Sequence, residues 1–100
     1  MGLKMEQLHV VISGLVQGVG FRYGARRTAL SLGLTGWVRN RLSGEVELVA
    51  QGAAEKIETL WQWLQTGPPG ARVDKIERLA CDPAPESYST FEIRPNSPQK

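Results

Sequence analysis

The stretch LHVVISGLVQGVGFR, residues 8–22, joins two kinds of hydrophobic pattern through a run of glycines. In residues 8–13 every second side chain is apolar, which predicts a strand with one buried face made by Leu8, Val10 and Ile12. From Phe21 the apolar spacing becomes that of a helix, and Gly33 is suited to end this helix in a left-handed conformation. The apolar positions of the helix are Phe21, Ala25, Ala29 and Leu32. The glycines therefore connect a strand to a helix.

The rest of the chain repeats this order of elements. We expect strands at 34–41 and 45–51, joined as a hairpin by a turn at 42–44, and then a helix over 53–66. A strand over 72–81 follows, whose imperfect alternation requires a bulge or a turn near Asp74 and Lys75, and TFEIR at 90–94 is a last short strand. This order, β-α-β-β-α-β plus a short C-terminal strand, predicts an α+β fold. It is a ferredoxin-like two-layer sandwich, with two helices packed on one face of a mainly antiparallel sheet.

The composition limits what kind of protein this is. The 100 residues suit a single domain over 1–100, with 1–6 and 96–100 expected as frayed tails. The lone cysteine, Cys81, permits no internal disulfide and is expected to be at least half-buried. No apolar run approaches the roughly 20 residues of a membrane span, so we expect a cytoplasmic protein that does not act at a membrane. With one histidine, His9, few transition-metal ligands are present, and we expect no metal and no cofactor.

The glycines and the arginine after them point to an anion site. Three glycines fall within seven residues, Gly14, Gly18 and Gly20, just before the helix. Successive backbone N–H groups can line a phosphate-sized nest, and the start of a helix adds N–H groups without partners. Arg22 can hold two phosphate oxygens with its guanidinium. The N–H groups expected to form this cradle are those of Val16, Gln17, Gly18, Val19 and Gly20.

Three familiar phosphate loops do not fit this stretch. A Walker A loop needs Lys followed by Ser or Thr, and the chain contains no such pair. In the dinucleotide fingerprint the third glycine would come one residue before Gly24, and basic Arg39 and Arg41 stand where an acidic residue is expected. A phosphatase loop built around a nucleophilic cysteine is excluded, because the stretch contains no cysteine. What remains is an anion nest without its own nucleophile, which directs attention to an attacking water.

Two motifs resemble those of the acylphosphatase family. The stretch G14-L-V-Q-G-V-G-F-R22 is similar to the family's first signature, and G36-W-V-R-N40 to its second. The segments S43-G-E-V-E47 and G67-P-P-G-A-R-V73 also resemble the family, and the likeness extends over residues 8–94. It implies hydrolysis of small acyl phosphates to carboxylate and phosphate without a metal. It also implies that Arg22 binds the phosphate and that Asn40 positions the water.

The residues themselves are compatible with that chemistry. The carboxylate of an acyl phosphate leaves easily, and the transition state of phosphoryl transfer mainly needs positioning and charge stabilisation. Asn40 shares the face of Val38 and can orient a water, although an asparagine at this place is also typical of a residue that closes a hairpin. No paired carboxylates or well-placed histidine stand ready as a base. We therefore expect the phosphate group of the substrate to accept the proton.

The same fold also occurs in RNA-binding and regulatory modules. An RNA-binding sheet would carry aromatic residues on its third strand, but EVELVAQG has none, so we expect no nucleic acid. A non-catalytic regulatory module that binds acyl or carbamoyl phosphate could keep the same nest and stays the alternative. The expected partner is a small acyl phosphate, with phosphate or sulfate able to occupy the site, and the expected state is a monomer.

Overall fold

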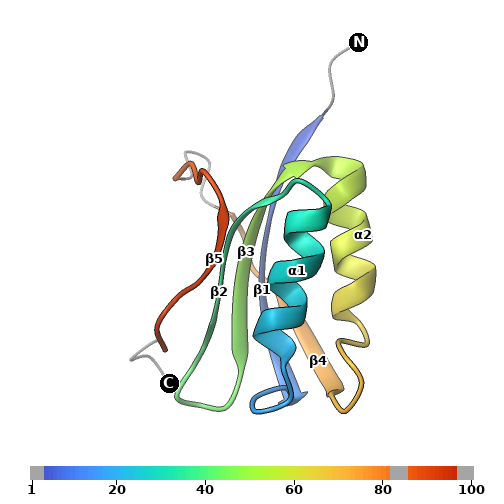
Figure 1. Cartoon of the computed structure of the whole chain (residues 1–100), viewed down its shortest axis with the longest axis vertical. Helices are drawn as coiled ribbons and strands as arrows, with labels where there is room; N and C mark the ends of the chain where they lie inside the picture. The colour runs from blue at the N-terminus through green and yellow to red at the C-terminus, as the bar shows by residue number, and fades with distance from the viewer. Residues whose placement is uncertain (1–3, 82–85, 97–100) are drawn as a thin grey trace.

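The computed structural model describes residues 4–81 and 86–96. Segments in which apolar and polar residues alternate form the strands, and segments with apolar residues every three or four positions form the helices. The elements follow one another in the predicted order (Figure 1). The elements are β1 (Met5–Leu15), α1 (Phe21–Ser31), β2 (Thr35–Asn40), β3 (Val46–Ala53), α2 (Ala54–Leu64), β4 (Arg72–Arg78) and β5 (Phe91–Ile93).

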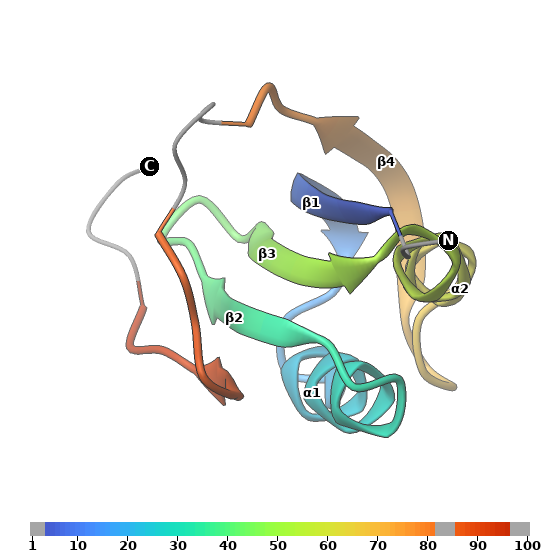
Figure 2. The ribbon, with the colours of Figure 1, turned by 90° about the horizontal axis from the view of Figure 1, so that it is seen from above.

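The strands form one sheet in the order β4-β1-β3-β2-β5. The pairs β1–β3, β1–β4 and β2–β3 are antiparallel, whereas β5 lies parallel to β2 at the edge. Figure 2 shows both helices on one side of the twisted sheet, while the chain that leads into β5 passes on the other. The α+β ferredoxin-like sandwich is therefore confirmed, with a mixed sheet because of the short C-terminal strand.

The core lies between the helices and the face of the sheet that they cover, called here the inner face. α1 contributes Phe21, Ala25 and Ala29, as its spacing predicts. α2 contributes Ile57, Leu60 and Leu64, and the inner face of the sheet is lined with fully buried aliphatic residues. These strand residues are Leu8, Val10, Ile12, Val38, Val46, Leu48 and Ala50. The opposite side of the sheet is called the outer face.

A close contact between the helices holds the first turn of α1 in place. A Cβ atom on Gly24 would stand 2.8 Å from the ring of Trp63, so only glycine allows this approach. The same tryptophan packs edge-on against Phe21, with ring centroids 5.4 Å apart. The first turn of α1 is thereby held against the end of α2, and the glycine run stands before it at the lower end of the sandwich in Figure 1.

The sheet extends further than the sequence predicted. Met5 and Glu6, expected within a frayed tail at 1–6, pair with Ala53 and Gly52 because β3 offers them partners. Residues 1–3 and 97–100 lie outside the described residues. The irregularity in β4 is a bulge, since Ser13 faces Lys75 while Gly14 faces Val73, which leaves Asp74 without a partner position.

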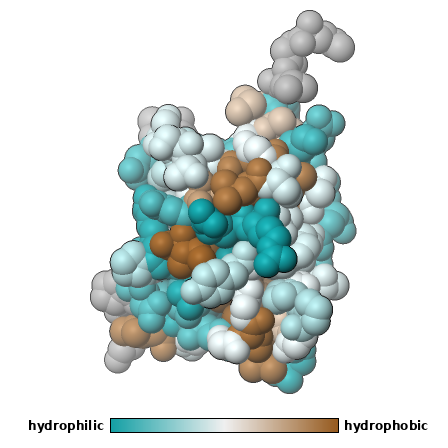
Figure 3. Space-filling model, viewed as in Figure 1, coloured by the Kyte–Doolittle hydropathy of each residue, from teal (hydrophilic) through white to brown (hydrophobic). Residues whose placement is uncertain are grey.

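The surface is polar with scattered apolar side chains. Figure 3 shows the apolar area on the helix-covered side broken into separate patches between hydrophilic ones. Cys81 is exposed, contrary to the expectation of a half-buried thiol, because it follows the end of β4 outside the core. Within residues 4–81 and 86–96, neither helix has the length and apolar character needed to cross a membrane.

Candidate functional site

The glycine loop between β1 and α1 owes its shape to two left-handed residues. Gly18 has φ of 75° and Gly20 has φ of 79°, a region that side chains rarely adopt. A Cβ atom on either glycine would meet nothing within 4 Å, so backbone conformation and not crowding requires glycine here. The space above both residues is therefore open to a ligand.

The loop leads into a helix start that suits an anion. Gly20 stands at the N-cap of α1 and offers no side-chain cap, and the first turn of the helix contains no acidic residue. The free N–H groups and the helix dipole leave this end electropositive. Val16 is buried in the core and Val19 packs against it, which ties the loop down by its side chains.

A hollow of about 260 Å³ lies over this helix start. Its lining residues are Val16, Gly18, Gly20, Phe21, Arg22 and Tyr23. No carboxylate is among them, and within the described part of the chain the guanidinium of Arg22 makes no ion pair. The hollow therefore combines backbone N–H groups with one arginine, which fits an anion of phosphate size.

The side chain of Gln17 anchors the loop from the side. Its Nε2 donates hydrogen bonds of 2.8 Å to the carbonyl oxygens of Arg41 and Glu45, in the turn between β2 and β3. Only the backbone of Gln17 is thus left to take part in a cradle. This role was missed from the sequence, because it joins residues 24 and 28 positions apart.

β2 ends at Asn40, and this end of the strand lies at the same end of the sandwich as the loop (Figure 1). Asn40 pairs with Val46, shares its face with buried Val38 and is itself only 8% exposed. Its Oδ1 atom is buried and has no hydrogen-bond partner among the described residues. Asn40 does not line the hollow over the helix start, but the bond from Gln17 to the carbonyl oxygen of its neighbour Arg41 brings the loop close to it. A buried oxygen without a partner is costly, and near a binding site it calls for a water or a ligand.

A network of ionic groups lies on the outer face behind Asn40. Glu47 is 4% exposed, and its Oε2 contacts Nε2 of His9 at 2.7 Å. Its Oε1 accepts a hydrogen bond of 3.1 Å from Nε of Arg39 and lies 3.6 Å from Nε of Arg41. Burial acts to raise the pKa of Glu47, but the hydrogen bonds from His9 and Arg39 outweigh it and hold the pKa below its ordinary value. The sequence did not identify Glu47 as the partner of His9.

A second ionic cluster fixes the turn between β2 and β3. Glu45 accepts hydrogen bonds from Ser43 at 2.8 Å and from Arg41 at 3.3 Å, and a further one from Ser13 at 3.3 Å. These bonds, led by that from Ser43, lower the pKa of the Glu45 carboxyl. The turn that receives the Gln17 side chain is therefore itself held firmly.

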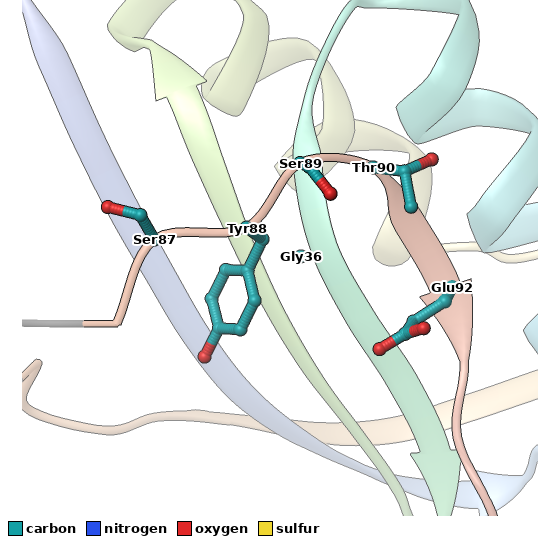
Figure 4. Close-up of a pocket in the computed structure, with 6 residues that line it drawn as sticks. All are labelled: Gly36, Ser87, Tyr88, Ser89, Thr90 and Glu92. Carbon is teal, nitrogen blue, oxygen red and sulfur yellow. The ribbon is translucent and has the colours of Figure 1, made fainter.

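A second hollow, of about 150 Å³, lies beside β5 and is unsuited to a phosphate. It is drawn in Figure 4, where the side chains of Ser87 and Thr90 point away from each other. Glu92 is the charged group among its lining residues, and its sign repels an anion. Nor do three potential metal ligands of the His, Cys, Asp and Glu types gather anywhere in residues 4–81 and 86–96.

This chain is similar to acylphosphatases in sequence and in structure. The family profile described as Acylphosphatase matches residues 8–93. An acylphosphatase of Cupriavidus pinatubonensis is 42% identical over 91 residues, covering 91% of this chain and 98% of that protein. Among solved structures, an acylphosphatase from Coxiella burnetii matches with a TM-score of 0.79 at 44% identity, over 90% of this chain and 93% of that one. An acylphosphatase from Bacillus subtilis matches with a TM-score of 0.83 at 32% identity, over 91% and 99%.

Proposed function

This chain belongs to the acylphosphatase family and is an acylphosphatase, and from that premise we propose that the glycine loop, Arg22 and Asn40 together hydrolyse a small acyl phosphate. The backbone N–H groups of Val16 to Gly20 and the guanidinium of Arg22 hold the phosphoryl oxygens. The hollow over the helix start supports this assignment, because it is electropositive and lined by no carboxylate.

The observation that carries the proposal is the unpartnered Oδ1 of Asn40. A buried carbonyl oxygen beside an anion-binding loop can accept a hydrogen bond from a water. It thereby aims a lone pair of the water oxygen at phosphorus. Asparagine is too weak a base to take the proton itself. Its role is therefore to position the water.

The reaction balances without a further protein base. The water oxygen bonds to phosphorus while the bond from phosphorus to the carboxyl oxygen breaks, and the leaving carboxylate keeps the electron pair. One water proton passes to a phosphoryl oxygen of the substrate. His9 is no candidate for this step, because its ring is bound to Glu47 on the outer face. We propose that no metal takes part, and a cytoplasmic, monomeric enzyme stays a prediction from the sequence.

Release of phosphate from benzoyl phosphate in the presence of EDTA tests the proposal. We expect the wild-type enzyme to hydrolyse benzoyl phosphate at the same rate with and without EDTA. Arg22→Ala is expected to lower kcat/KM by about 1,000-fold, because the loss of one donor to a developing oxyanion costs about 3–4 kcal/mol. The same variant loses inhibition by inorganic phosphate. Arg27→Ala, an exposed arginine on the same helix, is the matched control and keeps both.

Three results would contradict the proposal. Loss of activity in EDTA would establish a metal requirement. Retained turnover in Arg22→Ala would place the phosphate elsewhere. Stoichiometric binding of the acyl phosphate without turnover would favour the regulatory module.

A further inference from the structure

Glu47 is a buried carboxylate on the outer face, and each of its oxygens contacts a basic side chain. Its side chain is 6% exposed, and both of its oxygens are engaged. Oε1 is shared by Arg39, at 3.0 Å from a terminal guanidinium nitrogen, and by Arg41, at 3.6 Å. Oε2 takes His9 at 2.7 Å. One carboxylate on β3 thus contacts a side chain of β1, one of β2 and one just beyond the end of β2.

The two arginines are the chain neighbours of Asn40. In a strand, successive side chains point to opposite faces, so Arg39 and Arg41 lie on the outer face while Asn40 lies on the inner face. The register places Arg39 directly opposite Glu47, and Asn40 opposite Val46, the residue before Glu47. The carboxylate therefore contacts both chain neighbours of Asn40 from the outer face: Arg39 within β2, and Arg41 one residue beyond its end.

The side chain of Asn40 has no comparable support of its own. Its Oδ1 bonds to none of the described residues, so side-chain hydrogen bonds to that oxygen do not fix its direction. Its orientation depends on the backbone of β2 and on packing. The backbone at Asn40 is constrained where the flanking arginines are held.

We propose that Glu47 is a positioning residue for the hydrolysis: by clamping Arg39 and Arg41 it holds Asn40 at the angle that orients the attacking water. The proposal rests on the role proposed above for Asn40. It expects the phosphate cradle to depend less on Glu47, because Gln17 bonds backbone carbonyl oxygens of Arg41 and Glu45. Glu47 contacts the guanidinium of Arg41 and not its carbonyl, and that guanidinium keeps Glu45 as a second carboxylate partner.

A role in stability alone would also explain a buried, fully bonded carboxylate, and kinetics separate the two. Glu47→Gln keeps the size and an acceptor oxygen but removes the charge that attracts both arginines. We expect kcat to fall about tenfold, less than the roughly 100-fold that a displacement of 1 Å can cost, with the inhibition constant of phosphate unchanged within twofold. Glu92→Gln, which removes a carboxylate on β5 that accepts a hydrogen bond from Arg94, is the control and leaves kcat unchanged.

A double-mutant cycle with Asn40→Ala decides whether Glu47 acts through Asn40. If it does, Glu47→Gln lowers kcat in the wild-type background and has no further effect in Asn40→Ala. An equal loss in both backgrounds, an unchanged kcat in Glu47→Gln, or a raised inhibition constant for phosphate would overturn the inference. An unchanged kcat in Asn40→Ala alone would instead contradict the proposed function.

A second variant covers the case in which Glu47→Gln does not fold, which circular dichroism would reveal. Arg39→Met removes one arm of the clamp from a side chain that is 25% exposed. It is expected to lower kcat by about threefold, a fraction of the loss that displacement can cause, again only while Asn40 is present. A threefold loss that persists in Asn40→Ala would count against the clamp.

Discussion

The two faces of the sheet treat buried side-chain oxygens in opposite ways at the end of β2, although on the outer face Nε of Arg41 is buried without a hydrogen bond and has only an ion-pair contact of 3.6 Å to Glu47. On the inner face Asn40 stands among apolar residues with its Oδ1 unbonded. On the outer face Glu47 is still more buried, yet both of its oxygens have partners. A native protein rarely leaves a buried acceptor unsatisfied unless something else completes it. The difference between the oxygens agrees with the proposed roles, in which the unbonded oxygen of Asn40 binds a water and the bonded oxygens of Glu47 support the strand beside it.

Apolar replacement of each residue tests this contrast, and Glu47→Leu is expected to have the larger effect on folding. It leaves Arg39 and Arg41 without their carboxylate, and breaking a buried pair costs about 3–5 kcal/mol. Because these arginines are 25% and 19% exposed, we expect the lower end, about 3 kcal/mol. Urea denaturation followed by circular dichroism measures this loss.

A matched variant makes that number interpretable. Glu92→Leu removes an exposed carboxylate that pairs with Arg94, and surface pairs contribute less than about 1 kcal/mol. Equal losses in the free energy of unfolding of Glu47→Leu and Glu92→Leu would show that the buried ion pairs of Glu47 stabilise the fold no more than an exposed pair does.

Asn40→Leu is expected to act on the reaction and not on folding. It removes an unbonded polar atom from an apolar face and keeps about the same volume, so the free energy of unfolding should stay the same or rise. Loss of the water-positioning carbonyl should lower kcat by about 100-fold, comparable to removal of one oxyanion donor. Thermal denaturation and benzoyl phosphate hydrolysis measure the two effects. A strongly destabilised Asn40→Leu would mean that Asn40 has a structural role that its missing hydrogen bond conceals.

The sequence predicted the features that depend on neighbours along the chain. Periodicity located the strands and helices, and the glycine spacing indicated the anion nest. The broken alternation at Val73 and Ile76 predicted a bulge or a turn, of which the structure has the bulge. The likeness to a known family pointed to Arg22 and Asn40. In contrast, the bond from His9 to Glu47 spans 38 positions and depends on the register between β1 and β3, which no local pattern encodes. Parity alone showed that Arg39 and Arg41 share a face, but not which carboxylate lies between them.

The side chain of Gln17 links the glycine loop to the turn between β2 and β3. Its removal tests whether the loop serves phosphate binding and Asn40 serves the chemical step. Gln17→Ala loses two hydrogen bonds of 2.8 Å, each contributing about 1 kcal/mol. We expect the inhibition constant of phosphate to rise about tenfold, a change of about 1.4 kcal/mol, while kcat at saturating substrate falls less. Inhibition by inorganic phosphate measures the first quantity. A loss confined to kcat would mean that the loop positions the water and not the phosphate.

Acid should weaken the outer face before it affects the inner one. The folded protein holds the pKa of Glu47 below its ordinary value of 4.5, through hydrogen bonds from His9 and Arg39 and the charges of Arg39 and Arg41 that outweigh burial. A carboxyl with a lowered pKa contributes stability that is fully present above the unfolded value and is lost as the pH falls through the folded one. The melting temperature should therefore decline below about pH 4.5, and the decline should be shallower in Glu47→Gln. Asn40→Leu, which changes no titrating group, should decline in parallel with the wild type. Parallel curves for Glu47→Gln and the wild type would show that Glu45 or other carboxylates carry the acid sensitivity.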